Sequence, residues 1–156
     1  MEVIYVGIQG VFGGKVSTVT KEFLSASDFL KSLDDSIAEY RRILGDLLRK
    51  IEELRIKSEQ EAKLKGVLSK LGIQAPPTSP PANEINLRNV KILVNPFPQQ
   101  ELSSLEVAVE ALNNKITALT NIRKELEVLS ALGDIGLRVV VVYVDDIPRT
   151  IILKFA

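Results

Sequence analysis

The chain has 156 residues, of which 46% are hydrophobic and 26% charged, and its 20 basic residues balance its 20 acidic ones. This composition is typical of one ordered globular domain, and a net charge of zero removes the simplest basis for binding nucleic acid or an anionic membrane. The absence of Cys and His excludes disulfides, thiolate zinc sites and the nucleophile–histidine pairs of many hydrolases; with few Gln, it also fits a thermophilic source.

The N-terminus predicts a β-hairpin. Residues 2–8 are β-branched and aromatic, residues 10–14 are rich in Gly, and residues 15–20 predict a second strand. No basic segment precedes an apolar run here, so we expect no signal peptide and a cytoplasmic protein. The longest apolar run, residues 139–144, is far shorter than the roughly 20 residues that a membrane-spanning helix needs.

The first helix has the clearest pattern in the sequence. Ser25 or Ser27 is suited to cap its N-terminus, and Asp28 in its first turn would interact favourably with the helix dipole. Apolar residues then alternate at spacings of three and four over four heptads, which lays one narrow apolar stripe along a helix, as in a coiled coil. These residues are Leu30, Leu33, Ile37, Tyr40, Leu44, Leu47, Ile51 and Leu54.

This stripe breaks before the first helix ends. Ser58, Glu61 and Lys65 fall at positions that should be apolar, and the pattern resumes in a shifted register at Leu64, Leu68 and Leu71. Such a shift predicts a change of supercoil, or a bend near Ser58 to Glu61. Gly72 ends the helix, and the Pro-rich residues 74–84 predict an extended linker between two helical halves.

A short strand and a second long helix follow the linker. Residues 90–94 predict the strand, which stops at Asn95-Pro96, and Pro98 suits the first turn of the helix. Gly133 and Gly136 end this helix. Its apolar residues again alternate by three and four over the regular part, at Leu102, Leu105, Val109, Leu112, Ile116 and Leu119.

The C-terminus predicts a second hairpin, with strands at residues 137–144 and 150–155 and a turn at 145–149. The fold class is therefore α+β, with the order β-β-α-linker-β-α-β-β in a single domain, residues 1–156. The two long coiled-coil-like helices either kink, at Ser58 or at Asn113-Asn114, or project as an antiparallel pair beyond a small sheet made by the N- and C-terminal hairpins, and we prefer the projecting pair. This plan is loosely similar to prefoldin subunits, but those carry their hairpins between the helices, so no function follows from the similarity.

Two motifs suggest chemistry. Residues 7–15 (Gly-Ile-Gln-Gly-Val-Phe-Gly-Gly-Lys) resemble a phosphate-binding loop, but Gln9 and Val16 stand where a Walker A loop needs Gly and Ser or Thr. The sequence Tyr143-Val144-Asp145-Asp146 resembles the Tyr-x-Asp-Asp motif of reverse transcriptases, in which adjacent carboxylates hold metal ions. Since a turn explains each segment, we expect no catalytic residue, no metal site and no cofactor.

The fourteen regularly spaced apolar residues of the two helices, here called the helix seam, are the predicted interface. They would zip together within one chain, or contact a second copy or a partner protein. The preferred function is a non-catalytic structural or adaptor protein that acts as a coiled-coil dimer or as a subunit of a larger complex. One alternative is a nucleic-acid-associated factor that binds through Arg41, Arg42, Arg49 and Lys50, and another is a Mg²⁺-dependent enzyme that uses Asp145 and Asp146.

Overall fold

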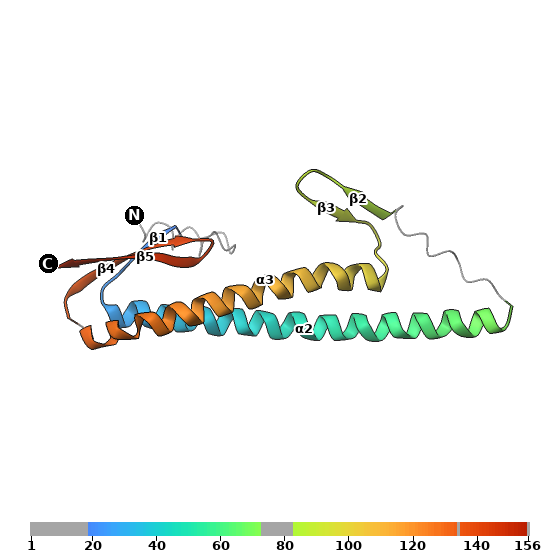
Figure 1. The fold of residues 1–156 in the computed structure, drawn as a ribbon, viewed down its shortest axis with the longest axis horizontal. Coiled ribbons are helices and arrows are strands. Elements are labelled where there is room, and N and C mark those ends of the chain that lie inside the picture. The colour runs from blue at the N-terminus through green and yellow to red at the C-terminus, as the bar shows by residue number, and fades with distance from the viewer. Residues whose placement is uncertain (1–18, 73–82, 134, 156) are drawn as a thin grey trace. The chain divides into compact units, whose positions relative to one another are not determined.

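The computed structural model describes residues 19–72, 83–133 and 135–155. The fold is α+β, as predicted, with two long helices packed antiparallel, of 45 and 35 residues, and two small antiparallel sheets (Figure 1). The elements in chain order are β1 (Thr20–Phe23), α2 (Ala26–Lys70), β2 (Glu84–Asn86), β3 (Lys91–Leu93), α3 (Pro98–Glu125), the 3₁₀ helix η2 (Leu126–Leu132), β4 (Leu137–Val144) and β5 (Ile147–Phe155).

The described order, β-α-β-β-α-β-β, differs from the predicted one in two places. The expected strand at 2–8, the Gly-rich turn and residues 15–18 of the second expected strand lie outside the described residues. Thr20, the last residue of that second strand, begins β1. Glu84, expected as the end of the linker, begins the short strand β2, which pairs with β3. A hairpin therefore does lie between the two helices, and the prediction that none does is wrong.

Helix α2 begins and continues for local reasons. The Ser25 hydroxyl accepts a hydrogen bond from the Asp28 backbone N–H at 3.1 Å, which satisfies one of the unpaired donors at the helix N-terminus. The helix remains α-helical through Ser58–Glu61, so the shift of the apolar register there does not interrupt it. Its final turn leads into Gly72, whose φ of 77° is the left-handed conformation that glycine tolerates best at a helix end.

Helix α3 begins at Pro98, as predicted. The Gln100 side chain reaches back and its Oε1 accepts a hydrogen bond from the Phe97 N–H at 2.9 Å, which is half of a capping box. The predicted helical stretch does reach Leu132, but its last seven residues form the tighter helix η2.

Packing divides the chain into two compact units. Unit 1 contains the described residues up to Arg42 and those from Leu112 onward, and unit 2 contains Ile43–Ala111. Each long helix contributes to both units. The described residues of each unit bury their own hydrophobic cluster.

Unit 1 packs helices against a three-stranded sheet of order β1-β4-β5. Alternate residues of β4 (Leu137, Val139 and Val141) are at most 2% exposed, because successive side chains of a strand point to opposite faces. Val139 and Val141 share a core with aromatic residues from β1 and α2 and with aliphatic residues from both helices. The buried members of this cluster are Phe23, Ala26, Phe29, Leu33, Ile37, Leu119, Val139 and Val141.

The β4–β5 hairpin confirms the predicted C-terminal hairpin, and the bounds of β4 match the expected strand. The expected turn at 145–149 is wrong, since the turn contains only Asp145 and Asp146, whose φ angles of 53° and 65° suit a tight two-residue connection. Strand β5 therefore begins at Ile147, and a register shift after Val142 accommodates the extra residue of β5.

Unit 2 has a smaller core. Ile51 and Leu54 of α2 are buried against Leu102 of α3, and Leu47, Leu105 and Val109 pack around them half-buried. The antiparallel β2–β3 hairpin belongs to this unit. Among the described residues, no helix is long and apolar enough to cross a membrane.

Candidate interaction surfaces

Most residues of the helix seam lie in, or pack against, the two hydrophobic clusters. Half of its fourteen residues are buried by the chain itself, and the other half are partly buried. Within unit 1, Leu33 and Ile37 share a core with Leu119, and within unit 2, Ile51 and Leu54 pack against Leu102. The buried residues are Leu30, Leu33, Ile37, Ile51, Leu54, Leu102 and Leu119; the partly buried ones are Tyr40, Leu44, Leu47, Leu105, Val109, Leu112 and Ile116. Contact of these side chains with a partner stays a prediction.

The basic side chains proposed for nucleic-acid binding have acidic neighbours. Arg42 pairs with Glu39 at 2.6 Å, and Arg49 pairs with Asp46 at 3.2 Å, each three residues apart on α2. Lys50 lies 4.0 Å from Glu101 of α3. Pairing with carboxylates reduces the positive potential that a phosphate backbone would meet. Arg41 is exposed.

One carboxylate of the β4–β5 turn, that of Asp146, has a basic neighbour. Asp146 Oδ2 lies 3.8 Å from Lys115 Nζ, and this ammonium group also lies 5.1 Å from the centre of the Tyr40 ring. Burial, followed by the negative charge of Asp146, raises the pKa of Tyr40. Among the described residues, no three side chains of the kinds that ligate metals come together. An ion pair thus ties the turn to α3, and the cation–π contact joins the same lysine of α3 to α2.

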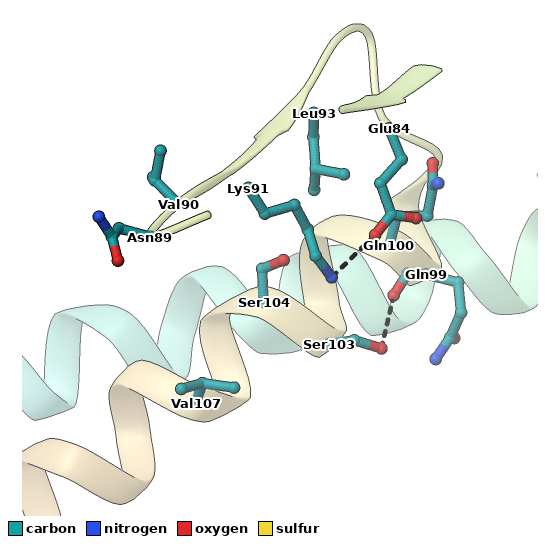
Figure 2. A pocket seen from close by; sticks show the side chains of 10 residues that line it. All are labelled: Glu84, Asn89, Val90, Lys91, Leu93, Gln99, Gln100, Ser103, Ser104 and Val107. Atoms are coloured by element: carbon teal, nitrogen blue, oxygen red, sulfur yellow. Dashed lines mark hydrogen bonds and ion pairs between the residues drawn. The ribbon is translucent and has the colours of Figure 1, made fainter. Parts of the chain in front are cut away.

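A pocket of about 770 Å³ lies between the β2–β3 hairpin and the first turns of α3. Figure 2 shows Glu84, Lys91 and Leu93 directed from the hairpin toward this helix, with Lys91 and Glu84 joined as an ion pair at 2.9 Å. The helix side is polar: Ser103 donates a hydrogen bond to the Gln99 carbonyl oxygen. The hairpin thus turns its charged face toward its own helix.

The opposite face of the hairpin is aliphatic and is exposed among the described residues. Directly paired residues of an antiparallel ladder point to the same side, so Ile85 and Ile92 share a face. Leu87 and Val90 extend this face toward the turn, where Val90 also borders the pocket. Five side chains make up this surface, the hairpin face, and each is 42–59% exposed. They are Ile85, Leu87, Val90, Ile92 and Val94.

A second apolar surface, exposed among the described residues, lies on the last turns of α2 and the residue that follows them. Leu64, Val67 and Leu71 are 58%, 54% and 69% exposed, and Leu68 is partly buried. Their spacing of three and four places them on one side of the helix. We call these four residues the distal stripe. Leu64, Leu68 and Leu71 are the residues at which the sequence predicts that the apolar pattern resumes.

Sequence reasoning missed the hairpin face, although a signal was present. From Ile85 to Ile92, apolar residues alternate with polar ones on both sides of the pair Arg88-Asn89, which is the pattern of a hairpin with one apolar face. The expected phosphate loop at residues 7–15 lies outside the described part of the chain. The sequence matches no protein-family model, and comparisons with curated proteins and with solved structures give no significant match.

Proposed function

We propose that this chain is a non-catalytic structural or adaptor protein that acts by contact with other protein chains, as a dimer or as a subunit of a larger complex. The observation that carries the proposal is the hairpin face. Its five aliphatic side chains are all about half exposed, while the charged pair of the same hairpin lies against α3. If the hairpin needed no partner, we would expect its aliphatic face to pack on α3 and its charged face to point to solvent.

The energetics of the hairpin support a partner. An isolated two-stranded sheet is marginally stable in water, and packing of one apolar face is what usually stabilises it. Covering the exposed half of one aliphatic side chain contributes about 1 kcal/mol. Five such side chains would therefore contribute about 5 kcal/mol before the cost of association. That amount is large compared with what the exposed Lys91–Glu84 ion pair supplies.

The two alternative functions have less support. Arg42, Arg49 and Lys50 each form an ion pair with a neighbouring carboxylate, and Asp146 forms one with Lys115. A nucleic-acid factor would show binding that weakens steeply with salt, and a Mg²⁺-dependent enzyme would be stabilised by the metal ion.

The proposal is tested with two matched double variants of the full chain. Ile85→Thr with Ile92→Thr removes the centre of the hairpin face but keeps β-branched residues in both strands. Asn86→Thr with Lys91→Thr is the control, because this cross-strand pair is the next one along the hairpin and lies on its other face.

The readouts are the solution mass by light scattering and the set of proteins that copurify from the native host. We expect the first variant to lose self-association or its partner and the control to retain it. A monomeric wild type with no specific copurifying protein would contradict the proposal. So would equal behaviour of the two variants.

A further inference from the structure

The distal stripe begins beside the first residues of α3, where Lys65 lines a pocket with Phe97 and Gln99, and continues past them. The Ser58 hydroxyl meets the Gln99 side chain at 3.3 Å, near the first residue of α3, so the turns of α2 that follow extend past the start of that helix. At 3.6 residues per turn, the centre of the distal stripe also lies roughly 90° around the helix axis from Leu54, which faces the unit 2 core. The stripe therefore does not continue the side of α2 that faces α3.

The charges of this segment are of one sign. Residues 62–72 contain Lys63, Lys65 and Lys70 and no acidic residue, whereas the preceding turns of α2 mix both signs. Lys63 and Lys70 lie on one side of the stripe and Lys65 on the other, each roughly 100° from its centre. None of the three forms an ion pair with another described residue. The segment thus offers aliphatic side chains between flanking ammonium groups.

We propose that the distal stripe docks an amphipathic helix of a partner protein whose own aliphatic stripe is flanked by carboxylates. Charge complementarity carries this assignment, since Glu or Asp at the edges of the partner would meet the three lysines. A second copy of the same segment would bring lysines against lysines, which is unfavourable. An anionic membrane is a poorer fit, because surface-bound helices usually insert aromatic residues and residues 56–72 have none.

This inference deepens the proposed function, because it assumes action by protein contact and names the chemistry of one partner. It concerns a different surface from the hairpin face. Its test uses the full chain and two labelled synthetic helical peptides with identical leucine stripes, one flanked by Glu and the other by Lys. Fluorescence anisotropy measures the binding of each peptide at low salt.

We expect the Glu-flanked peptide to bind at least tenfold more tightly than the Lys-flanked one. Leu64→Ser with Leu71→Ser should weaken this binding roughly tenfold, and because both side chains are exposed, the thermal midpoint should stay unchanged. Reversal of charge at Lys63, Lys65 and Lys70 to Glu should invert the preference. Reversal at Lys31, Arg41 and Lys124, three exposed basic residues of unit 1, is the matched control and should leave it intact.

Four results would overturn the inference. They are no binding of either peptide, equal binding of both, binding only to phosphatidylserine vesicles, and a wild-type dimer that dissociates when Leu64 and Leu71 are replaced. Failure here is separable from failure of the proposed function. Loss of association in the Ile85→Thr/Ile92→Thr variant would still support the proposed function if neither peptide bound the distal stripe.

Discussion

Arg123 of α3 donates a hydrogen bond from Nε to Asp34 Oδ1 of α2 at 2.8 Å, across 89 positions of the sequence. The same guanidinium group donates to Glu127 one turn further along. These two hydrogen bonds are the main causes that raise the pKa of Arg123. The pair joins the two antiparallel helices within unit 1 beside the buried residues Leu33 and Leu119, so an ion pair and apolar packing stabilise the same helix contact.

The Arg123–Asp34 pair should make a small but measurable contribution to stability. In a double-mutant cycle with Asp34→Ala and Arg123→Ala, we expect a coupling free energy of about 0.5–1 kcal/mol, because the pair is partly exposed and solvent screens it. Urea unfolding of the four proteins measures this energy. High salt should reduce it, and a coupling of zero at low salt would contradict the predicted contribution.

Leu119 should be among the costliest positions to truncate. Its side chain is 0% exposed and packs in the unit 1 core, so Leu119→Ala should lower the free energy of unfolding by about 3 kcal/mol through lost burial and the cavity left behind. Val107→Ala is the control, since Val107 is 68% exposed on the same helix. Its cost should stay within about 0.5 kcal/mol. Equal costs at the two positions would argue against the described core.

Stability should fall at alkaline pH because of Tyr143. Burial raises the pKa of this phenol to about 12, above its ordinary value of 10. The folded state therefore holds the proton more tightly than the unfolded chain does. The resulting contribution to stability is complete below pH 10 and disappears as the pH rises toward 12. The urea midpoint of the wild type should accordingly fall more steeply between pH 10 and 12 than that of Tyr143→Phe, and parallel curves would contradict the burial of the phenol.

The Asp145-Asp146 turn should behave as a structural connection. Both residues have positive φ, and Asn tolerates this conformation at least as well as Asp, so Asp145→Asn should leave the thermal midpoint unchanged or slightly raised. Addition of Mg²⁺ or Mn²⁺ to the wild type should produce no shift of the midpoint. A rise in the midpoint that Asp145→Asn abolishes would instead favour the metal-dependent alternative.

The long elements were predictable from sequence because their signals are redundant. Helix α2 has an N-cap, four heptads of alternation and a terminal glycine, and β4 is a near-continuous apolar run that ends at a turn. The shorter elements were not. Strand β2 has three residues and follows a Pro-rich segment whose composition predicts extended chain, so the short alternation that begins at Ile85 was its only signal.

The sequence could not specify which element packs against each apolar stripe. Periodicity shows that Leu33 or Leu102 must be buried, but a helix of the same chain and a helix of a partner satisfy that requirement equally well. The structure supplies an intrachain neighbour for both residues. It leaves the hairpin face and the distal stripe exposed among the described residues. These two surfaces are therefore better candidates for contact with a partner than the helix seam.

Amide hydrogen exchange at the β2–β3 hairpin in the assembled protein tests the central claim most directly. The Leu87 N–H donates to the Val90 carbonyl oxygen and the Val94 N–H to the Asn83 carbonyl oxygen, each at 2.8 Å, so both amides report on opening of the hairpin. If another protein surface covers the hairpin face, these amides should exchange slowly in the wild type and fast in the Ile85→Thr/Ile92→Thr variant. Fast exchange in both proteins would contradict the account.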